Sequence, residues 1–239
     1  KSADQYADFS GTLISSNFPI AVFAGHVCAR VPVGVAACDH IVEQQVAVNQ
    51  LGKRFAITKT LGQSYDVVMI TAIQDNTIVK QNGNIIATLQ AYESYTFKFY
   101  ENSAYLETSN PAICYLYLTG ADANNGQGDP SSVLISPIEQ RVQSITFATF
   151  ETSLIDYQAM NIITTLLGAQ DMIFDGQNIA SEFQPLEGNP DLYYARCKIE
   201  HNTHTLSTNK DGFIGHVYGL GHCESYAYSV GASTLDLSG

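Results

Sequence analysis

The chain has 239 residues, of which 45% are hydrophobic and 14% are charged, and its formal net charge is −12. This composition excludes a disordered chain, and the acidic balance makes nucleic acids and anionic lipid surfaces unfavourable partners. No apolar run approaches the roughly 18 residues that a membrane-spanning helix needs, so we expect no transmembrane segment.

The N-terminal part of the chain contains a short sequence segment that recurs twice. Residues 13–26, "LISSNFPIAVFAGH", are echoed by "LETSNPAICYLYLTG" at residues 106–120 and by "LSTNKDGFIGHVYGLGH" at residues 206–222. The first copy matches the end of a repeat with no beginning before it. We therefore predict that residues 1–38 form a hairpin and a loop, which either end an upstream unit or dock on the next unit as an extra pair of strands.

The five cysteines allow one or two disulfides. Cys28 and Cys38 bracket the short loop "CARVPVGVAAC", whose Pro and Gly bends favour a local disulfide. Cys197 and Cys223 lie in neighbouring predicted strands and are candidates for a second pair, which would leave Cys114 over. The alternative is five reduced, buried thiols that act as small hydrophobic side chains.

The densest polar cluster consists of His26, Asp39, His40 and Glu43. If the disulfide draws its ends together, these side chains converge as a set suited to a transition metal or to acid–base chemistry. Alternatively, Asp39 and His40 cap the loop while Glu43 binds backbone groups. The Glu-Gln pair at 43–44 recurs at 139–140 without an Asp-His pair, which favours the structural role. We expect no metal and no cofactor, and retain His26, Asp39 and His40 as candidate binding residues.

The pattern in the middle of the chain predicts short strands arranged in two similar units. Runs such as "YDVVMITAI" and "YTFKFY" are rich in β-branched and aromatic residues, and turn residues separate them. Asn82-Gly83 and Asp175-Gly176 occupy equivalent places and favour type I′ hairpin turns. The segment "IVEQQVAVNQLG" shows some helical periodicity, but its counterpart "IEQRVQSITFATF" alternates, so we predict extended chain for both.

The spacing between the two units is that of a whole β-sandwich domain. The dipeptides at 43–44 and 74–75 recur at 139–140 and 170–171, both 96 residues later, and sandwich domains have about 100 residues. We predict an all-β fold of two tandem antiparallel β-sandwiches, immunoglobulin-like or jelly-roll-like. Their predicted extents are residues 39–122 and 131–239, joined by a linker rich in Gly, Asn, Asp and Pro.

The last fifth of the chain holds four histidines and a tyrosine pair. The histidines at positions 201, 204, 216 and 222 read as ordinary surface or interface residues. Tyr226 and Tyr228 stand on one side of a terminal strand, where they could form a platform for sugar rings or a peptide. The alternative for this pair is packing on the neighbouring unit. No Walker loop, G-x-S-x-G, H-E-x-x-H or C-x-x-C motif occurs, so we do not expect an enzyme.

Two segments carry a family resemblance. "SNFPIAVFAGHVCARVPVGVAACDHIVEQ" resembles the segment that marks the IgGFc-binding domain, which occurs in mammalian IgG Fc-binding mucus proteins and in bacterial surface proteins, and "GHVYGLGHCESYAYSVG" resembles the closing segment of that family. The matching residues are Pro19, Gly25, His26, Cys28, Pro32, Gly34, Cys38, Asp39, His40 and Glu43. The resemblance implies an extracellular all-β adhesion or recognition module without catalysis, in which Cys28 and Cys38 are bonded. It does not imply that this chain binds antibody.

The functional expectation is a non-catalytic module of a secreted or surface-anchored protein. Its expected ligand is a host or mucus glycoprotein, with immunoglobulin as one candidate, and the absence of an Asn-X-Ser/Thr sequon leans towards a bacterial source. The alternatives are a carbohydrate-binding accessory module, a structural spacer, and an enzyme centred on the polar cluster at residues 26–43.

Overall fold

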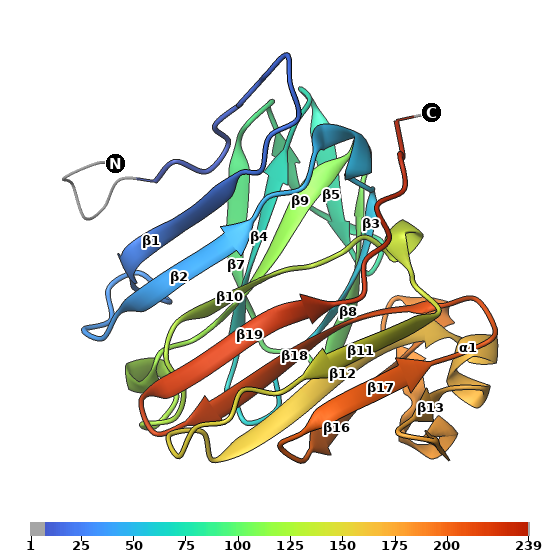
Figure 1. The fold of residues 1–239 in the computed structure, drawn as a ribbon. Helices are drawn as coiled ribbons and strands as arrows, with labels where there is room; N and C mark the ends of the chain where they lie inside the picture. The colour runs from blue at the N-terminus through green and yellow to red at the C-terminus, as the bar shows by residue number, and fades with distance from the viewer. Residues whose placement is uncertain (1–7, 239) are drawn as a thin grey trace.

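The structure, a computed structural model, describes residues 8–238 and consists almost entirely of antiparallel β-sheets. Strands account for 50% of the structure described and helices for 7%, which confirms the predicted all-β fold class. In Figure 1 the cyan and green strands of the first half lie above the yellow to red strands of the second half, and the blue N-terminal hairpin lies beside them.

The hairpin consists of β1 (Phe23–Ala29) and β2 (Asp39–Gln44). The two strands pair antiparallel, with Gly25 opposite Val42 and His26 opposite Ile41, and they form a separate two-stranded sheet. Strand β2 runs close to the edge strand β10 of the first sandwich.

The first sandwich has two four-stranded sheets, in the orders β10-β9-β4-β7 and β3-β8-β5-β6. Its strands are β3 (Arg54–Thr58), β4 (Asp66–Ala72), β5 (Thr77–Gln81), β6 (Asn84–Leu89), β7 (Ser94–Phe99), β8 (Ser103–Thr108), β9 (Ala112–Leu118) and β10 (Ser131–Leu134). Strand β4 shows why they form: Val68, Ile70 and Ala72 alternate along it and all point into the core.

The second sandwich has sheets in the orders β15-β16-β12-β18-β19 and β11-β17-β13-β14. Its strands are β11 (Ser144–Ala148), β12 (Tyr157–Thr165), β13 (Ile173–Phe174), β14 (Gln177–Asn178), β15 (Gln184–Leu186), β16 (Asn189–Ile199), β17 (Thr203–Ser207), β18 (Phe213–Gly221) and β19 (Glu224–Val230). The core contains Met160, Phe213 and Val217 from the larger sheet and Leu206 from the smaller one.

The two sandwiches share one strand order. Replacing β10, β9, β4 and β7 by β19, β18, β12 and β16 converts one large sheet into the other, apart from the extra edge strand β15. The small sheets correspond in the same way. One predicted boundary differs from this pairing: Ser131–Leu134, assigned to the second unit, pairs with β9 of the first, because the chain turns back after the linker instead of crossing to a new sheet.

Both predicted hairpin turns are confirmed. Asn82 and Gly83 have φ values of 50° and 82°, and Asp175 and Gly176 have φ values of 47° and 79°. Each pair forms the two-residue connection between paired strands, β5 with β6 and β13 with β14. Positive φ at both central residues is what a type I′ turn requires, and Asn, Asp and Gly adopt it most readily.

The helical elements are short and lie between strands. They are the α-helix α1 (Leu166–Gln170) and the 3-10 turns η1 (Val48–Gln50), η2 (Ala121–Ala123), η3 (Ile138–Gln140) and η4 (Ala180–Glu182). The matching of residues 43–44 with 139–140 is wrong in structural terms: Glu43 lies in β2, whereas Glu139 lies in η3. The counterpart of η3 is η1, since each turn directly precedes the first strand of a sandwich.

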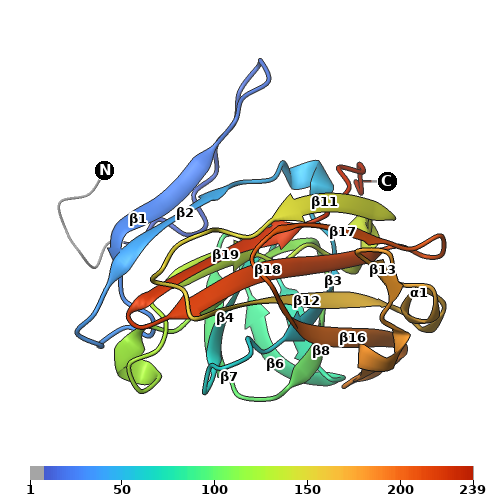
Figure 2. The same cartoon turned by 60° about the horizontal axis from the view of Figure 1, so that its bottom comes forward.

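The sandwiches pack closely against each other. All nine residues of β18 are buried, because one face of its sheet covers the second core and the other face packs against the first sandwich. Figure 2 shows β12 and β18 between β11 and β17 on one side and the strands of the first sandwich on the other. The run "FIGHVYGLG", which contains His216 but no Asp, Glu, Lys or Arg, is typical of a strand buried on both faces.

Candidate binding surface

Three connections between strands meet at one end of the molecule, and we call them the loop cluster. They are residues 30–38 between β1 and β2, residues 119–130 between β9 and β10, and the two-residue turn at 222–223 between β18 and β19. Each connection closes an equivalent hairpin. Binding residues are often found on loops that a rigid sheet scaffold positions, so this cluster is the first candidate surface.

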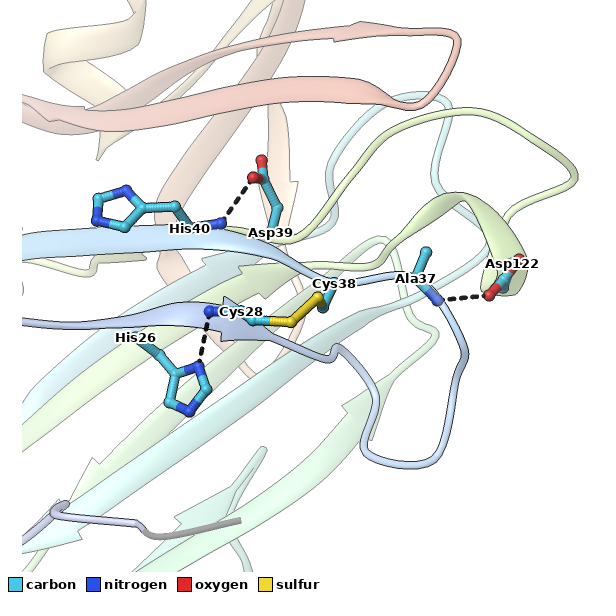
Figure 3. The surroundings of a disulfide bond; sticks show 7 residues. All are labelled: His26, Cys28, Ala37, Cys38, Asp39, His40 and Asp122. Carbon is cyan, nitrogen blue, oxygen red and sulfur yellow. Dashed lines mark hydrogen bonds between the residues drawn. A yellow bond between two sulfur atoms is a disulfide. The ribbon is translucent and has the colours of Figure 1, made fainter. Parts of the chain in front are cut away.

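Backbone hydrogen bonds hold the three loops together. The Gly120 N–H donates to the Val31 carbonyl over 2.9 Å, and the Gly128 N–H donates to the Gly221 carbonyl over 2.8 Å. The Asp122 carboxylate accepts from the N–H groups of Ala36 and Ala37 over 3.0 and 2.9 Å. Figure 3 shows Asp122 reaching Ala37 from the neighbouring loop.

A disulfide between Cys28 and Cys38 closes the first loop at its base, as the family resemblance implies. Its Cα atoms are 4.9 Å apart. The suggested second pair is not formed: Cys197 packs against the second core and Cys223 is exposed in the β18–β19 turn, so the two side chains occupy different environments. Cys114 is a buried free thiol in the first core.

The loop cluster is acidic. Partial burial, together with the nearby negative charges of Asp39, Glu224 and Asp122, raises the pKa of Asp129 to about 6. The Asp129 Oδ1 atom is buried without a hydrogen-bond partner. Carboxylates gathered in this way favour contact with cationic groups of a ligand.

The three predicted binding residues of the hairpin do not converge on one point. Figure 3 shows His26 and His40 on opposite sides of the hairpin, as expected when His26 pairs with Ile41, the neighbour of His40. The His26 Nδ1 atom accepts from the Cys28 N–H, and the Asp39 carboxylate accepts from the His40 N–H. Asp39 lies at the base of the loop cluster, and the His40 side chain is exposed.

Glu43 has the structural role that sequence reasoning favoured. Its carboxylate accepts from the Leu134 N–H of β10 over 3.3 Å, which ties the hairpin to the first sandwich. Burial raises the pKa of Glu43, and the hydrogen bond from Leu134 offsets part of that rise.

Tyr226 and Tyr228 lie side by side on β19, with ring centroids 6.0 Å apart and planes 16° apart. Both rings are partly buried against the second core. The Tyr228 hydroxyl donates to the Ala148 carbonyl over 2.5 Å, and the Tyr226 hydroxyl contacts Gln158 and the Phe150 N–H. Their polar atoms are therefore engaged within the fold, and only part of each ring remains for a ligand.

The sequence did not single out Asp122, Asp129 or Glu224 as site residues. The available signal was the repeat: if the three hairpins are equivalent, the loops that close them come to the same end of a stacked assembly. Within residues 8–238, no three side chains among His, Cys, Asp and Glu lie close enough to hold a metal ion. No helix in the described part of the chain has the length and apolar character to cross a membrane.

Comparisons with known proteins agree with the sequence resemblance. The model of the family described as "IgGFc binding protein" matches residues 2–219. The human IgGFc-binding protein is 30% identical over 135 residues, which is 55% of this chain and only 2% of that protein's length.

Two solved structures of a Pleurotus ostreatus lectin, one apo and one with GalNAc, are 11% and 12% identical to this chain. They cover 78% and 79% of it, and it covers 82% and 83% of them, with TM-scores of 0.25 and 0.22. Likeness this slight says nothing about a ligand. The family match spans most of the chain, and the chain belongs to the IgGFc-binding protein family.

Proposed function

We propose that this chain is a non-catalytic, extracellular recognition module that binds a protein or glycoprotein through the loop cluster. The observation that carries the proposal is the family match over residues 2–219, since the family is described by binding. The disulfide supports an extracellular location, because such bonds persist in oxidising compartments.

The geometry of the loop cluster supports recognition of a macromolecule. The disulfide closes the first loop, the Asp122 hydrogen bonds join it to the second, and the Gly128 N–H joins the second to the third. Ligand binding would therefore cost little ordering entropy. Val33 stands at the tip of the first loop with 85% of its surface exposed. An exposed apolar tip beside carboxylates suits a protein surface that carries both apolar and basic side chains.

The candidate contact residues are Asp39 and His40 beside the loops, with Asp122, Asp129 and Glu224 as additions from the structure. His26, Tyr226 and Tyr228 stay candidates of the sequence analysis, although internal hydrogen bonds occupy their polar groups. The family description names IgG Fc, so immunoglobulin G is the first ligand to test.

The test is capture by the immobilised chain from three sources: purified human IgG, serum and solubilised intestinal mucus. We expect saturable capture of IgG or of a specific glycoprotein. Asp122→Ala should weaken it about tenfold or more, because the loop at residues 30–38 loses its anchor. Asp191→Ala is the matched control, since Asp191 is an exposed carboxylate on β16 away from the loops. No capture from any source, or equal loss in both variants, would contradict the proposal.

A further inference from the structure

The N-terminal segment carries a third copy of the strands that close each sandwich. "LISSN" at residues 13–17 resembles "LETSN" at 106–110 and "LSTN" at 206–209, which lie at the ends of β8 and β17. "FAGHV" at residues 23–27 differs from "FIGHV" at 213–217 in one residue. The segment therefore matches the last strands of a sandwich, although in this structure it closes neither of the two sandwiches.

The strand pairing identifies what the third copy lacks. Strand β9 pairs with β10 on one edge and with β4 on the other, and β18 likewise pairs with β19 and with β12. Within residues 8–238, β1 pairs with β2 alone. Its second edge presents unpaired backbone groups, which is the position that a strand of the β4 and β12 type occupies in the complete units.

The exposed face of the hairpin matches a face that is buried in the complete units. Phe23, Val27 and Val42 lie on one face and are 65%, 68% and 52% exposed. Their counterparts in "FIGHV", Phe213 and Val217, are completely buried in the second core. Leu13 of "LISSN" is also exposed.

Exposed large hydrophobic residues are concentrated in the N-terminal segment. Eleven of the 19 large hydrophobic residues that are exposed in the described chain precede residue 49. Exposed apolar side chains that gather on one face of a soluble protein mark interaction sites, and Phe23, Val27 and Val42 share one face of the hairpin.

We propose that residues 12–44 form the last strands of a third sandwich, and that a further unit of the same repeat supplies its other strands. A strand of the β4 and β12 type pairs antiparallel with the free edge of β1, and the face of Phe23, Val27 and Val42 closes the core of that unit. The occupant is such a unit and not a second copy of this chain, because both sandwiches here are already closed by their own strands. Each unit then ends directly after β2, β10 or β19. The unit after β2 begins at the 3-10 turn η1, and the unit after β10 begins at η3.

The mode of binding is strand addition. Main-chain hydrogen bonds along β1 supply affinity, and alternate side chains of the added strand meet the apolar face. The register of β12 against β18 indicates the complement: Met160 lies opposite Val217, and Ile162 lies opposite Gly215. Met160 and Ile162 would meet the same positions on β1, namely Val27 and Gly25. This proposal concerns assembly and is independent of the ligand of the loop cluster.

The test uses the whole chain and a synthetic peptide with the sequence of residues 157–165, flanked by lysines for solubility. We expect saturable binding and slower hydrogen exchange at residues 23–29. Phe23→Lys and Val27→Lys should each weaken binding about tenfold or more, whereas Ile85→Lys, at an exposed site on β6, should leave it unchanged. Both hairpin variants should keep the melting temperature within about 2 °C, because their side chains are solvent-exposed.

Three results would overturn the inference. One is the absence of slower exchange at residues 23–29 at saturating peptide, and another is equal binding of a peptide with the scrambled sequence. The third is a sedimentation mass of two chains together with protection of β1 when no peptide is present, since this would make the face a contact between copies. Capture of ligand by the loop cluster should persist in Phe23→Lys, which separates this test from that of the proposed function.

Discussion

Asp66 and His216 are two buried ionisable residues. Their shifted pKa values have opposite effects on how the unfolding free energy changes with pH. Burial raises the pKa of Asp66 from 3.8 to about 7, and a hydrogen bond from the Thr60 N–H limits this rise. Burial lowers the pKa of His216 from 6.5 to about 4. The Asp66 Oδ1 and His216 Nε2 atoms have no hydrogen-bond partner. Both side chains are therefore more stable uncharged in the folded chain than ionised.

The sign of each effect follows from proton binding. Between pH 4 and about 7, folded Asp66 holds a proton that the unfolded chain releases, so its contribution to stability falls as pH rises. Between about pH 4 and 6.5, the unfolded chain holds a proton on His216 that the folded chain does not, so this contribution rises with pH. The two effects oppose each other below pH 6.5.

Single variants should separate the two effects. The unfolding free energy of Asp66→Asn minus that of the wild type should increase from pH 4 to 7, by up to about 1.4 kcal/mol per pH unit. For His216→Gln the same difference should decrease from pH 4 to 6.5. Urea unfolding at four pH values between 4.5 and 7.5 measures both. Differences that do not vary with pH would show that these groups do not titrate as described.

At the scale of elements, the β1–β2 hairpin is a module with its own covalent closure. It is held by the Cys28–Cys38 disulfide and by polar contacts with the first sandwich, and its apolar residues lie outside both sandwich cores. Its local stability therefore depends little on either core.

We expect the double variant Cys28→Ser/Cys38→Ser to loosen the hairpin without unfolding the sandwiches. Closing a loop of this length contributes about 3 kcal/mol in the chain-entropy model, and here that loss falls on the hairpin. Hydrogen exchange at residues 29–38 should accelerate while the melting temperature changes by less than about 3 °C. Cys223→Ser, at an exposed free thiol, is the control and should change neither. A large fall in melting temperature would show that the hairpin is part of the cooperative core.

Sequence patterns predicted most of the strands and turns but not how these elements pack together in three dimensions. Alternation and the Asn82-Gly83 and Asp175-Gly176 turns are local signals, and both led to correct strands and connections. Proximity of the three loops is not a local property, because it depends on how β10 and β19 come side by side. For the same reason Asp122 was missed: its partners Ala36 and Ala37 are more than 80 residues away in sequence. Tyr226 and Tyr228 alternate like surface residues, but both rings pack against the second core and their hydroxyl groups bind groups between residues 148 and 158.

At the scale of the whole molecule, a buried polar network joins the two sandwiches. The Asn161 amide of β12 donates to the Thr58 hydroxyl over 2.9 Å, and its carbonyl oxygen accepts from the Tyr218 hydroxyl over 2.9 Å. The Tyr218 oxygen in turn accepts from the Leu61 N–H over 2.9 Å. Apolar contacts surround this network, so separating the sandwiches would expose both apolar surface and unpaired polar groups.

We therefore expect the two sandwiches to unfold together. Calorimetry should show one transition with equal calorimetric and van't Hoff enthalpies. Asn161→Ala should lower the unfolding free energy by about 3 kcal/mol, because it leaves buried partners unsatisfied. The matched control Asn84→Ala removes an exposed amide and should have little effect. Two resolved transitions in the wild-type chain would mean that each sandwich is an independent domain.

The most direct test of the account is hydrogen exchange of the chain with and without the ligand that it captures. If the loop cluster is the recognition surface, protection should appear at residues 30–38, 119–130 and 221–224 together. Asp122→Ala should reduce it, and Asp191→Ala should not. Protection confined to the sheet faces or to Phe23, Val27 and Val42, with no change in the three loops, would contradict the assignment.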